Sequence, residues 1–177
     1  MDSLETVKLW AENPYFDTET RSAAKKHLSD DKQNEREECF GSLLEFGTGG
    51  LRGIMGVGTN RINRYTIQMA TEGLARIINK KRKETEASGV VIGYDSRHRS
   101  FEFAKISSQV LAAHGIPVFL FREIAPTPLV SCELLRRKAI AGIIITASHN
   151  PPEYNGYKVY WENGGLIVPP EDTKIIE

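Results

Sequence analysis

The chain has 177 residues, which is enough for one domain with a hydrophobic core and too few for most multidomain enzymes. Lysine plus arginine and aspartate plus glutamate both total 23, so no broad positive field exists to gather nucleic acid or an anionic membrane surface. This balance excludes nucleic acid and membrane as expected partners and favours a small molecule.

The first 42 residues predict a helical extension. Asn13 and Pro14 form a stop signal, and Asp17 is a suitable N-cap for a following helix. A glycine-rich stretch comes next, over residues 47–53. We expect this stretch to be irregular rather than helix or strand.

Helices and strands then alternate along the chain. Apolar residues spaced by three and four predict an amphipathic helix from about Arg64 to Lys81. The elements expected after it are a strand at Val90–Tyr94, a helix from about Phe101 to His114, a strand at Pro117–Phe121, a short helix opened by Pro126 and a strand at Ala139–Ile145.

The last part of the chain predicts an antiparallel edge. Asn155–Gly156 is a turn signal, and residues 157–161 and 166–168 can pair as a hairpin across Asn163, Gly164 and Gly165. The order of elements is typical of the α/β class. We expect a mixed, largely parallel sheet sandwiched between helices, with the helical extension at the N-terminus.

Ser148 is the residue best placed for chemistry. It follows the β-branched run 143–145, and open α/β sheets build their ligand sites beyond the carboxyl ends of such strands. Neighbours on an extended segment point to opposite faces, so His149 is poorly placed to deprotonate Ser148, which disfavours a serine hydrolase. Ser148 could carry a phosphoryl group stabilised by loop amides and cations, or it could merely cap a turn together with Asn150.

Three basic residues could serve the same crevice. Glycines around Arg52 could admit an anion to the backbone, with the guanidinium as a clamp, although a purely structural loop is the alternative. Arg97 follows a strand end and could reach the crevice, or it could pair locally with Asp95. Lys158 stands ten residues after Ser148 and could fold back toward it.

The cysteines and the N-terminus indicate a compartment. Cys39 and Cys132 are isolated, without the spacing of a metal site or the density of a disulfide-built domain. The first residues lack the basic start and apolar stretch of a signal peptide. We therefore expect reduced thiols and a cytoplasmic protein.

Four motifs stand in the order found in the first domain of the α-D-phosphohexomutases, the phosphoglucomutase and phosphomannomutase family. The segment Thr146–Pro151 resembles the phosphoserine loop of that family, and the other matches are Phe46–Gly53, Gly93–Arg97 and Asn155–Lys158. On this resemblance, residues 43–177 are the catalytic-serine domain, preceded by the helical extension over residues 1–42. The extension and the stretch 155–161 resemble most closely the branch that contains phosphoglucomutase 2 and phosphopentomutase.

The resemblance implies a phosphoryl transfer. Phosphorylated Ser148 would give its phosphoryl group to a sugar monophosphate, and the resulting bisphosphate would reorient and return its other phosphate. The cycle would interconvert glucose 1-phosphate and glucose 6-phosphate, primed by glucose 1,6-bisphosphate. The implied catalytic residues are Ser148, Lys158 as general acid/base, His149 and Arg52. The implied substrate-binding residues are Thr48, Arg52, Arg97, Asn150 and Lys158.

A Mg²⁺ dependence is also implied, with Ser148 supplying one ligand through its phosphate. The metal loop of the family lies in its second domain, and nothing in this sequence matches it. We therefore expect the remaining domains of the same polypeptide as partners, and little activity from this chain alone. The alternatives are a phosphopentomutase of the same family and a non-enzymatic module that binds a sugar phosphate or a protein.

Overall fold

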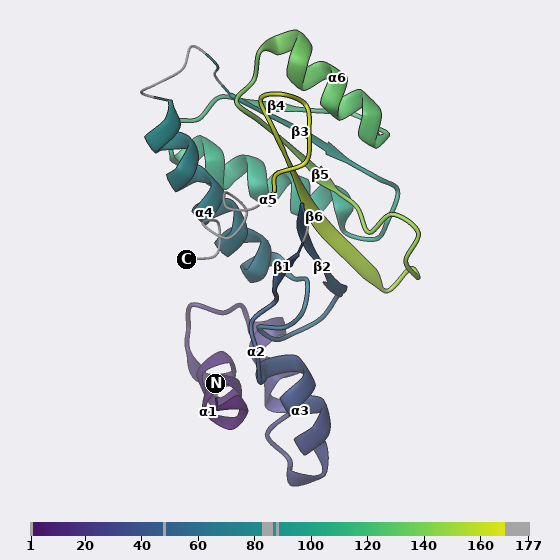
Figure 1. Ribbon diagram of the computed structural model, residues 1–177. Helices are drawn as coiled ribbons and strands as arrows, with labels where there is room; N and C mark the ends of the chain where they lie inside the picture. Colours follow the sequence, from purple (N-terminus) through teal and green to yellow (C-terminus); the bar gives the residue numbers. More distant parts are fainter. Residues whose placement is uncertain (1, 48, 83–86, 88, 169–177) are drawn as a thin grey trace.

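The computed structural model describes residues 2–47, 49–82, 87 and 89–168. This part of the chain forms six α-helices and a six-stranded sheet (Figure 1). The helices are α1 (Ser3–Glu12), α2 (Thr18–Lys25), α3 (Gln33–Phe40), α4 (Arg64–Lys81), α5 (Ser100–Ala113) and α6 (Thr127–Arg137), with a short 3-10 helix η1 (Asp30–Lys32) before α3. The strands are β1 (Phe46–Gly47), β2 (Gly50–Ile54), β3 (Val90–Tyr94), β4 (Val118–Leu120), β5 (Ala141–Ile145) and β6 (Tyr154–Trp161).

The sheet is mixed, with the strand order β1-β2-β6-β5-β3-β4. Strands β4, β3 and β5 run parallel to one another. Strands β5 and β6, β6 and β2, and β2 and β1 pair antiparallel. The sheet therefore has a parallel half, β3 to β5, and an antiparallel half, β1, β2 and β6, joined along the β5–β6 pair.

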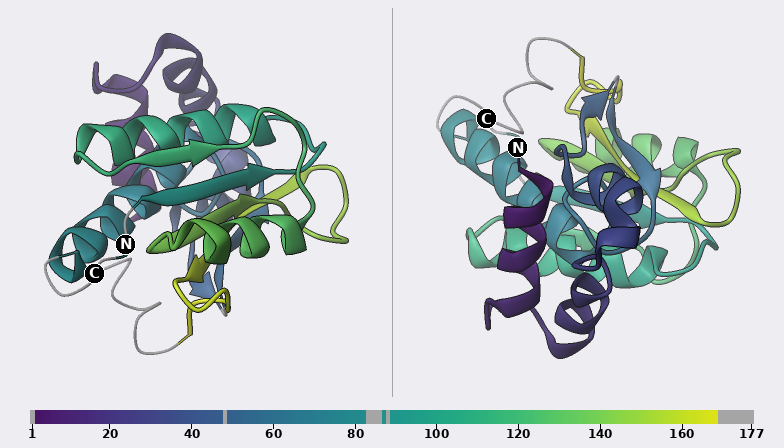
Figure 2. Two further views of the ribbon diagram at one scale, coloured as in Figure 1. Left: turned by 90° about the horizontal axis from the view of Figure 1, so that it is seen from above. Right: turned by 90° about the horizontal axis from the view of Figure 1, so that it is seen from below.

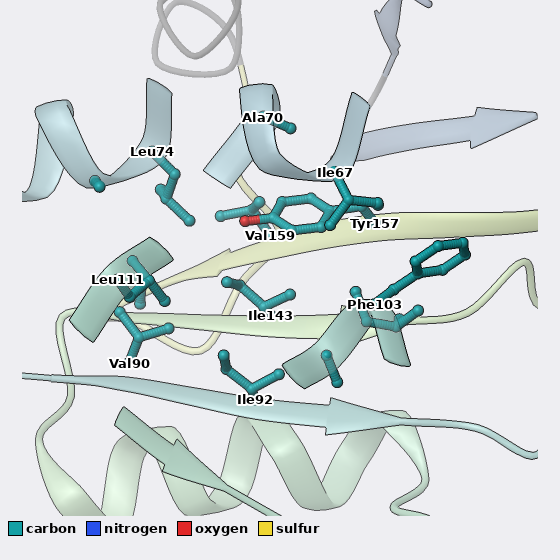
Figure 3. Packing of buried hydrophobic residues seen from close by; sticks show 14 of the residues in the cluster. Ile67, Ala70, Leu74, Val90, Ile92, Phe103, Leu111, Ile143, Tyr157 and Val159 are labelled. Carbon is teal, nitrogen blue, oxygen red and sulfur yellow. The ribbon is translucent and has the colours of Figure 1, made fainter. Parts of the chain in front are cut away.

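Helices cover both faces, which confirms the expected α/β sandwich. Alternate residues of β5 point to opposite sides, since Ile143 packs in the cluster with α4 and α5 whereas Ile144 packs in the cluster with α6. Figure 2 shows α5 and α6 on opposite sides of the sheet. Figure 3 shows Phe103 and Leu111 of α5 closing over the same strands that Leu74 of α4 covers. No described helix is long and apolar enough to cross a membrane.

The N-terminal helices form a second, smaller cluster. Trp10, Phe16 and Phe40 pack around Tyr65, which lies in the first turn of α4. Asp17 caps α2 as expected, because its carboxylate accepts a hydrogen bond from the Thr20 amide at 2.8 Å. The Tyr65 hydroxyl donates to the same carboxylate at 2.9 Å. The extension is thus attached to the helix that follows the glycine-rich segment.

Two local expectations were wrong. The glycine-rich segment is not irregular, since it supplies β1 and β2, and Asn155–Gly156 lies inside β6 rather than at a turn. Gly50 explains the first error: a Cβ there would lie 2.0 Å from the Tyr157 carbonyl oxygen, so glycine permits β2 to approach β6 closely. Pairing with β2, where Asn155 faces Gly53 and Gly156 faces Arg52, overrides the local turn preference of Asn155–Gly156.

The expected C-terminal hairpin is present only in reduced form. The chain turns after β6 and returns through an isolated antiparallel bridge between Tyr160 and Leu166. The Ile167 amide donates to the Val159 carbonyl at 2.9 Å. The antiparallel edge of the sheet is therefore built by β1 and β2 instead of by this hairpin.

Candidate active site

Ser148 lies in the loop after β5, as predicted. It is exposed and has a positive φ of 57°, a left-handed conformation that is costly for a residue with a Cβ. Its amide donates to the Thr146 hydroxyl at 3.0 Å, and the Asn150 amide donates to the Ala147 carbonyl at 3.1 Å. These bonds make a tight turn that presents the serine at its tip.

The prediction that His149 points away from Ser148 assumed an extended segment, and that assumption is wrong. Because Ser148 is left-handed, its Oγ lies 3.4 Å from His149 Nδ1. The contact is long for a hydrogen bond, and His149 is exposed. Among the described residues, no carboxylate orients the imidazole, so a serine–histidine–acid triad is absent from this part of the chain.

Arg97 binds the backbone of the same loop. It reaches the crevice and also pairs with Asp95, at 3.3 Å between Nε and Oδ2, so both predicted contacts occur together. Its two terminal nitrogens donate to the carbonyl oxygens of Ser148, Asn150, Pro151 and Tyr154 at 2.6–3.1 Å. The guanidinium of Arg97 therefore binds the backbone of the Ser148 loop at four carbonyls.

Arg52 approaches the loop from the antiparallel half. It lies in β2 opposite Gly156 of β6, and its Nη1 donates to Asn150 Oδ1 at 3.0 Å. A Cβ on Gly156 would lie 2.6 Å from the Thr146 carbonyl oxygen and 2.7 Å from that of Leu51. Glycine at position 156 thus allows the strand carrying Arg52 to lie close to the start of the serine loop.

Lys158 is in the middle of β6, not beyond a turn. It pairs with Gly50 on one side and with Ile144 on the other. Because side chains alternate along a strand, Lys158 and Arg52 project from the same face of the sheet. Both line a hollow of about 580 Å³ at the β1–β2 edge. The structure therefore brings two cations to one hollow, and one of them, Arg52, also contacts the serine loop.

Asn155 is a site residue that the sequence reasoning missed. It is fully buried, and its Nδ2 donates at 3.0 Å to both the His98 carbonyl and the Ser100 hydroxyl. Ser100 in turn donates to Asp95 at 2.7 Å. The sequence contains no clear signal for it, because Asn155–Gly156 is also typical of a turn; its burial inside a strand, where an amide requires hydrogen-bond partners, is visible only in the structure.

Two predicted features remain, the substrate-binding residue Thr48 and a metal site. Thr48 lies outside the described residues. No group of three or more His, Cys, Asp or Glu side chains in the described ranges could hold a metal ion.

Comparison with known proteins defines the class to which this fold and serine loop belong. The family model "Phosphoglucomutase/phosphomannomutase, alpha/beta/alpha domain I" matches residues 43–177. The chain belongs to this family of sugar phosphate mutases.

Individual relatives give a finer view. The chain is 42% identical to the human "Phosphopentomutase" over 88% of its own length and 26% of the relative, and 44% identical to the "Phosphoglucomutase" of Staphylococcus aureus over 80% and 25%. A solved structure described as a putative phosphomannomutase from Thermus thermophilus superimposes with a TM-score of 0.69 and 33% identity, covering 76% of this chain and 29% of that one. The chain thus spans about a quarter of the length of these relatives.

Proposed function

We propose that this chain is the phosphoserine domain of a phosphoglucomutase or phosphomannomutase that interconverts sugar 1-phosphates and 6-phosphates. The observation that carries the proposal is the placement of Ser148, which is exposed at the tip of a turn with two cationic side chains in hydrogen-bond contact with its loop. A serine held in this way can take and release a phosphoryl group, because phosphoryl transfer depends mainly on positioning and on neutralising charge. Family membership supports the same reaction class.

In the proposed cycle Ser148 begins as the phosphoserine. A hydroxyl oxygen of a sugar monophosphate attacks phosphorus, the bond between phosphorus and Ser148 Oγ breaks, the sugar hydroxyl proton passes to Lys158 Nζ, and the departing Oγ takes up a proton from solvent. The resulting bisphosphate reorients and presents its other phosphate to Ser148. The serine hydroxyl then attacks and releases its proton to solvent, the phosphoserine re-forms, and Lys158 returns its proton to the departing sugar oxygen. Glucose 1,6-bisphosphate would prime an unphosphorylated serine.

The other assigned residues act around this transfer. We assign Arg52 and His149 to the reacting phosphoryl group, since the first is bonded to the loop and the second contacts Ser148 Oγ. We assign substrate contacts to Thr48, Arg52, Asn150 and Lys158, and not to Arg97, which was also predicted but whose terminal nitrogens bond the loop backbone.

A Mg²⁺ ion would neutralise charge on the transferred group, with the phosphate on Ser148 as one ligand. Because the described residues lack a metal cluster, the other ligands and the loops that select the sugar would come from further domains of a longer polypeptide. In this proposal residues 43–177 form the serine domain and residues 1–42 its helical extension, in a cytoplasmic enzyme. The isolated chain would have little or no mutase activity.

A phosphopentomutase of the same family is the second candidate. The alignment with the human phosphopentomutase covers 88% of this chain, against 80% for the staphylococcal phosphoglucomutase, so more of this chain has a counterpart in the former. Identity does not separate them, at 42% and 44%. Substrate preference between hexose and pentose phosphates is therefore decided by assay.

The test compares native protein with Ser148→Ala in the full-length natural protein that carries this chain. Glucose 1-phosphate and ribose 1-phosphate are assayed in parallel with Mg²⁺ and glucose 1,6-bisphosphate, and phosphorylation is followed by intact mass. Ser148→Ala should lose the phosphoprotein and at least about a thousandfold in turnover. The control, Ser108→Ala on α5, removes a hydroxyl that bonds only within its own helix. Turnover retained in Ser148→Ala contradicts the mechanism, and a native protein inactive on every sugar phosphate favours a binding module.

A further inference from the structure

All five N–H donors of Arg97 face partners inside the protein: four are hydrogen-bonded to backbone carbonyls, and the fifth, on Nε, faces a carboxylate. A guanidinium has five N–H donors. Nη1 donates to the carbonyls of Pro151 at 2.8 Å and Tyr154 at 3.1 Å, and Nη2 donates to those of Ser148 at 2.9 Å and Asn150 at 2.6 Å. Nε faces the Asp95 carboxylate at 3.3 Å. No donor is left to bind a substrate phosphate.

The side chain is also fixed at its base. Arg97 is only 14% exposed, and the Asp95 carboxylate that it faces accepts the Arg97 backbone amide at 3.0 Å and the Ser100 hydroxyl at 2.7 Å. Arg52 differs on each point, because it is exposed and makes one hydrogen bond to a side chain of the loop. Of the two guanidiniums, Arg52 remains accessible to a ligand and Arg97 does not.

The contact with the Ser148 carbonyl sets the direction of the next peptide group. A peptide unit is planar and trans, so its C=O and N–H point in opposite directions. Since the Ser148 carbonyl points at Arg97, the His149 amide points away from Arg97, and among the described residues it has no acceptor. The same contacts offset the cost of the left-handed backbone at Ser148.

We propose that Arg97 is a positioning residue for phosphoryl transfer: by binding four backbone carbonyls between Ser148 and Tyr154, it holds Ser148 in its left-handed conformation and directs the His149 amide to the outer side of the loop. The kinetic part of this inference rests on the proposed function, whereas its structural part does not. Lysine cannot replace Arg97, because one ammonium nitrogen cannot span carbonyls that a forked, planar guanidinium reaches.

Hydrogen exchange tests the structural part in the full-length natural protein. The Asn150 and Tyr154 amides bond within the loop, to the carbonyls of Ala147 and Pro151. Their exchange should accelerate by at least about tenfold in Arg97→Met and by at least about threefold in Arg97→Lys, while the β3 amides stay protected. The matched control is Arg122→Met, which removes an exposed arginine. If Arg97→Met does not fold, Arg97→Lys carries the test. Unchanged exchange in a folded variant overturns the inference.

Steady-state kinetics and direct titration with the sugar phosphate test the catalytic part. In Arg97→Lys, kcat and the rate of Ser148 phosphorylation by the bisphosphate should fall at least about tenfold, with the substrate Kd changed less than about threefold. A raised Kd with kcat unchanged would show instead that Arg97 binds the substrate. Absence of phosphoserine in the native protein would refute the proposed function and the kinetic role, and the exchange result would still decide whether Arg97 holds the loop.

Discussion

The two halves of the sheet contribute to the site in different ways. In the parallel half, β3 and β5 are buried along their whole length, and the polar groups stand in the loops after the strands. In the antiparallel half, Arg52 and Lys158 stand within β2 and β6 themselves. Backbone hydrogen bonds position Ser148, whereas strand register positions Arg52 and Lys158. The position of Ser148 should therefore change when a contact with its loop is lost. The positions of Arg52 and Lys158 should change when a substitution shifts β2 or β6.

The largest effect that we expect in the antiparallel half comes from replacing Lys158, the proposed general acid/base. Lys158→Met keeps the approximate length of the side chain and the strand register but removes the amine. It should lower kcat by about 10²- to 10⁴-fold, with KM changed less than about tenfold, because proton transfer is lost while binding is mostly retained. Lys105→Met, an exposed lysine of α5, serves as the control in steady-state assays. A loss confined to KM would assign Lys158 to binding alone.

The junction between the halves can be broken by a single methyl group. Gly156→Ala would place a Cβ 2.6 Å and 2.7 Å from two backbone oxygens of neighbouring segments, neither of which can move aside cheaply. We expect the free energy of unfolding to fall by about 3 kcal/mol, measured by denaturant titration. Gly56→Ala is the matched control, since its nearest neighbours are side-chain carbons of Arg61 at 3.7 Å. Equal stability of the two variants would show that β6 can move away from Thr146 and Leu51 without cost.

The smallest effect concerns the other face of β6. Tyr157 is fully buried beneath α4 (Figure 3). Among the described residues its hydroxyl has no partner in hydrogen-bond geometry, and the Thr71 hydroxyl near it donates to the Ile67 carbonyl instead. Tyr157→Phe should therefore leave stability unchanged or raise it by up to about 1 kcal/mol at pH 7, because no bond is lost. A loss of more than this would reveal a partner for the hydroxyl.

The native protein and Tyr157→Phe should also differ in how their stability changes with pH. Burial raises the pKa of the Tyr157 phenol above its usual value of 10.0. The unfolded chain then loses this proton at a lower pH than the native protein, so stability is complete below about pH 10 and declines as the pH rises further. In Tyr157→Phe this phenol is absent, so the free energy of unfolding should fall less steeply above about pH 10, by the slope that one titrating proton contributes. Denaturant titrations at several pH values measure this slope, and an identical slope in both proteins would contradict the raised pKa.

Much of this architecture could be read from the sequence. The helix Arg64–Lys81 begins and ends where its apolar spacing placed it, and the strand Val90–Tyr94 is also as predicted. Ser148 was placed correctly because a continuous apolar run ending in polar residues marks a strand end in a buried sheet. These features are local, so a short window of residues contains the information.

The errors share a physical cause. The glycines around Arg52 suggested irregular backbone, yet Gly50 permits close approach to β6, a strand about a hundred residues away in the sequence. The relation of His149 to Ser148 was misjudged because a left-handed φ at serine has no local sequence signal. The role of Arg97 depends on four carbonyls, and carbonyls are common to all residues. Long-range pairing and backbone contacts could not be predicted from residue type.

The position of β6 in the sheet has a consequence for how the molecule is made. It is the last described strand in the chain, yet it sits between β2 and β5 and is the partner that brings Lys158 beside β2. At ribosomal rates of 5–20 residues per second, about 5–20 s separate the synthesis of β2 from that of β6. During that interval β2 can pair only with the two-residue β1 and exposes an open strand edge. The serine and lysine sides of the site therefore meet only at the end of domain folding, and chaperone protection of the nascent chain would be most valuable before residue 161 has emerged.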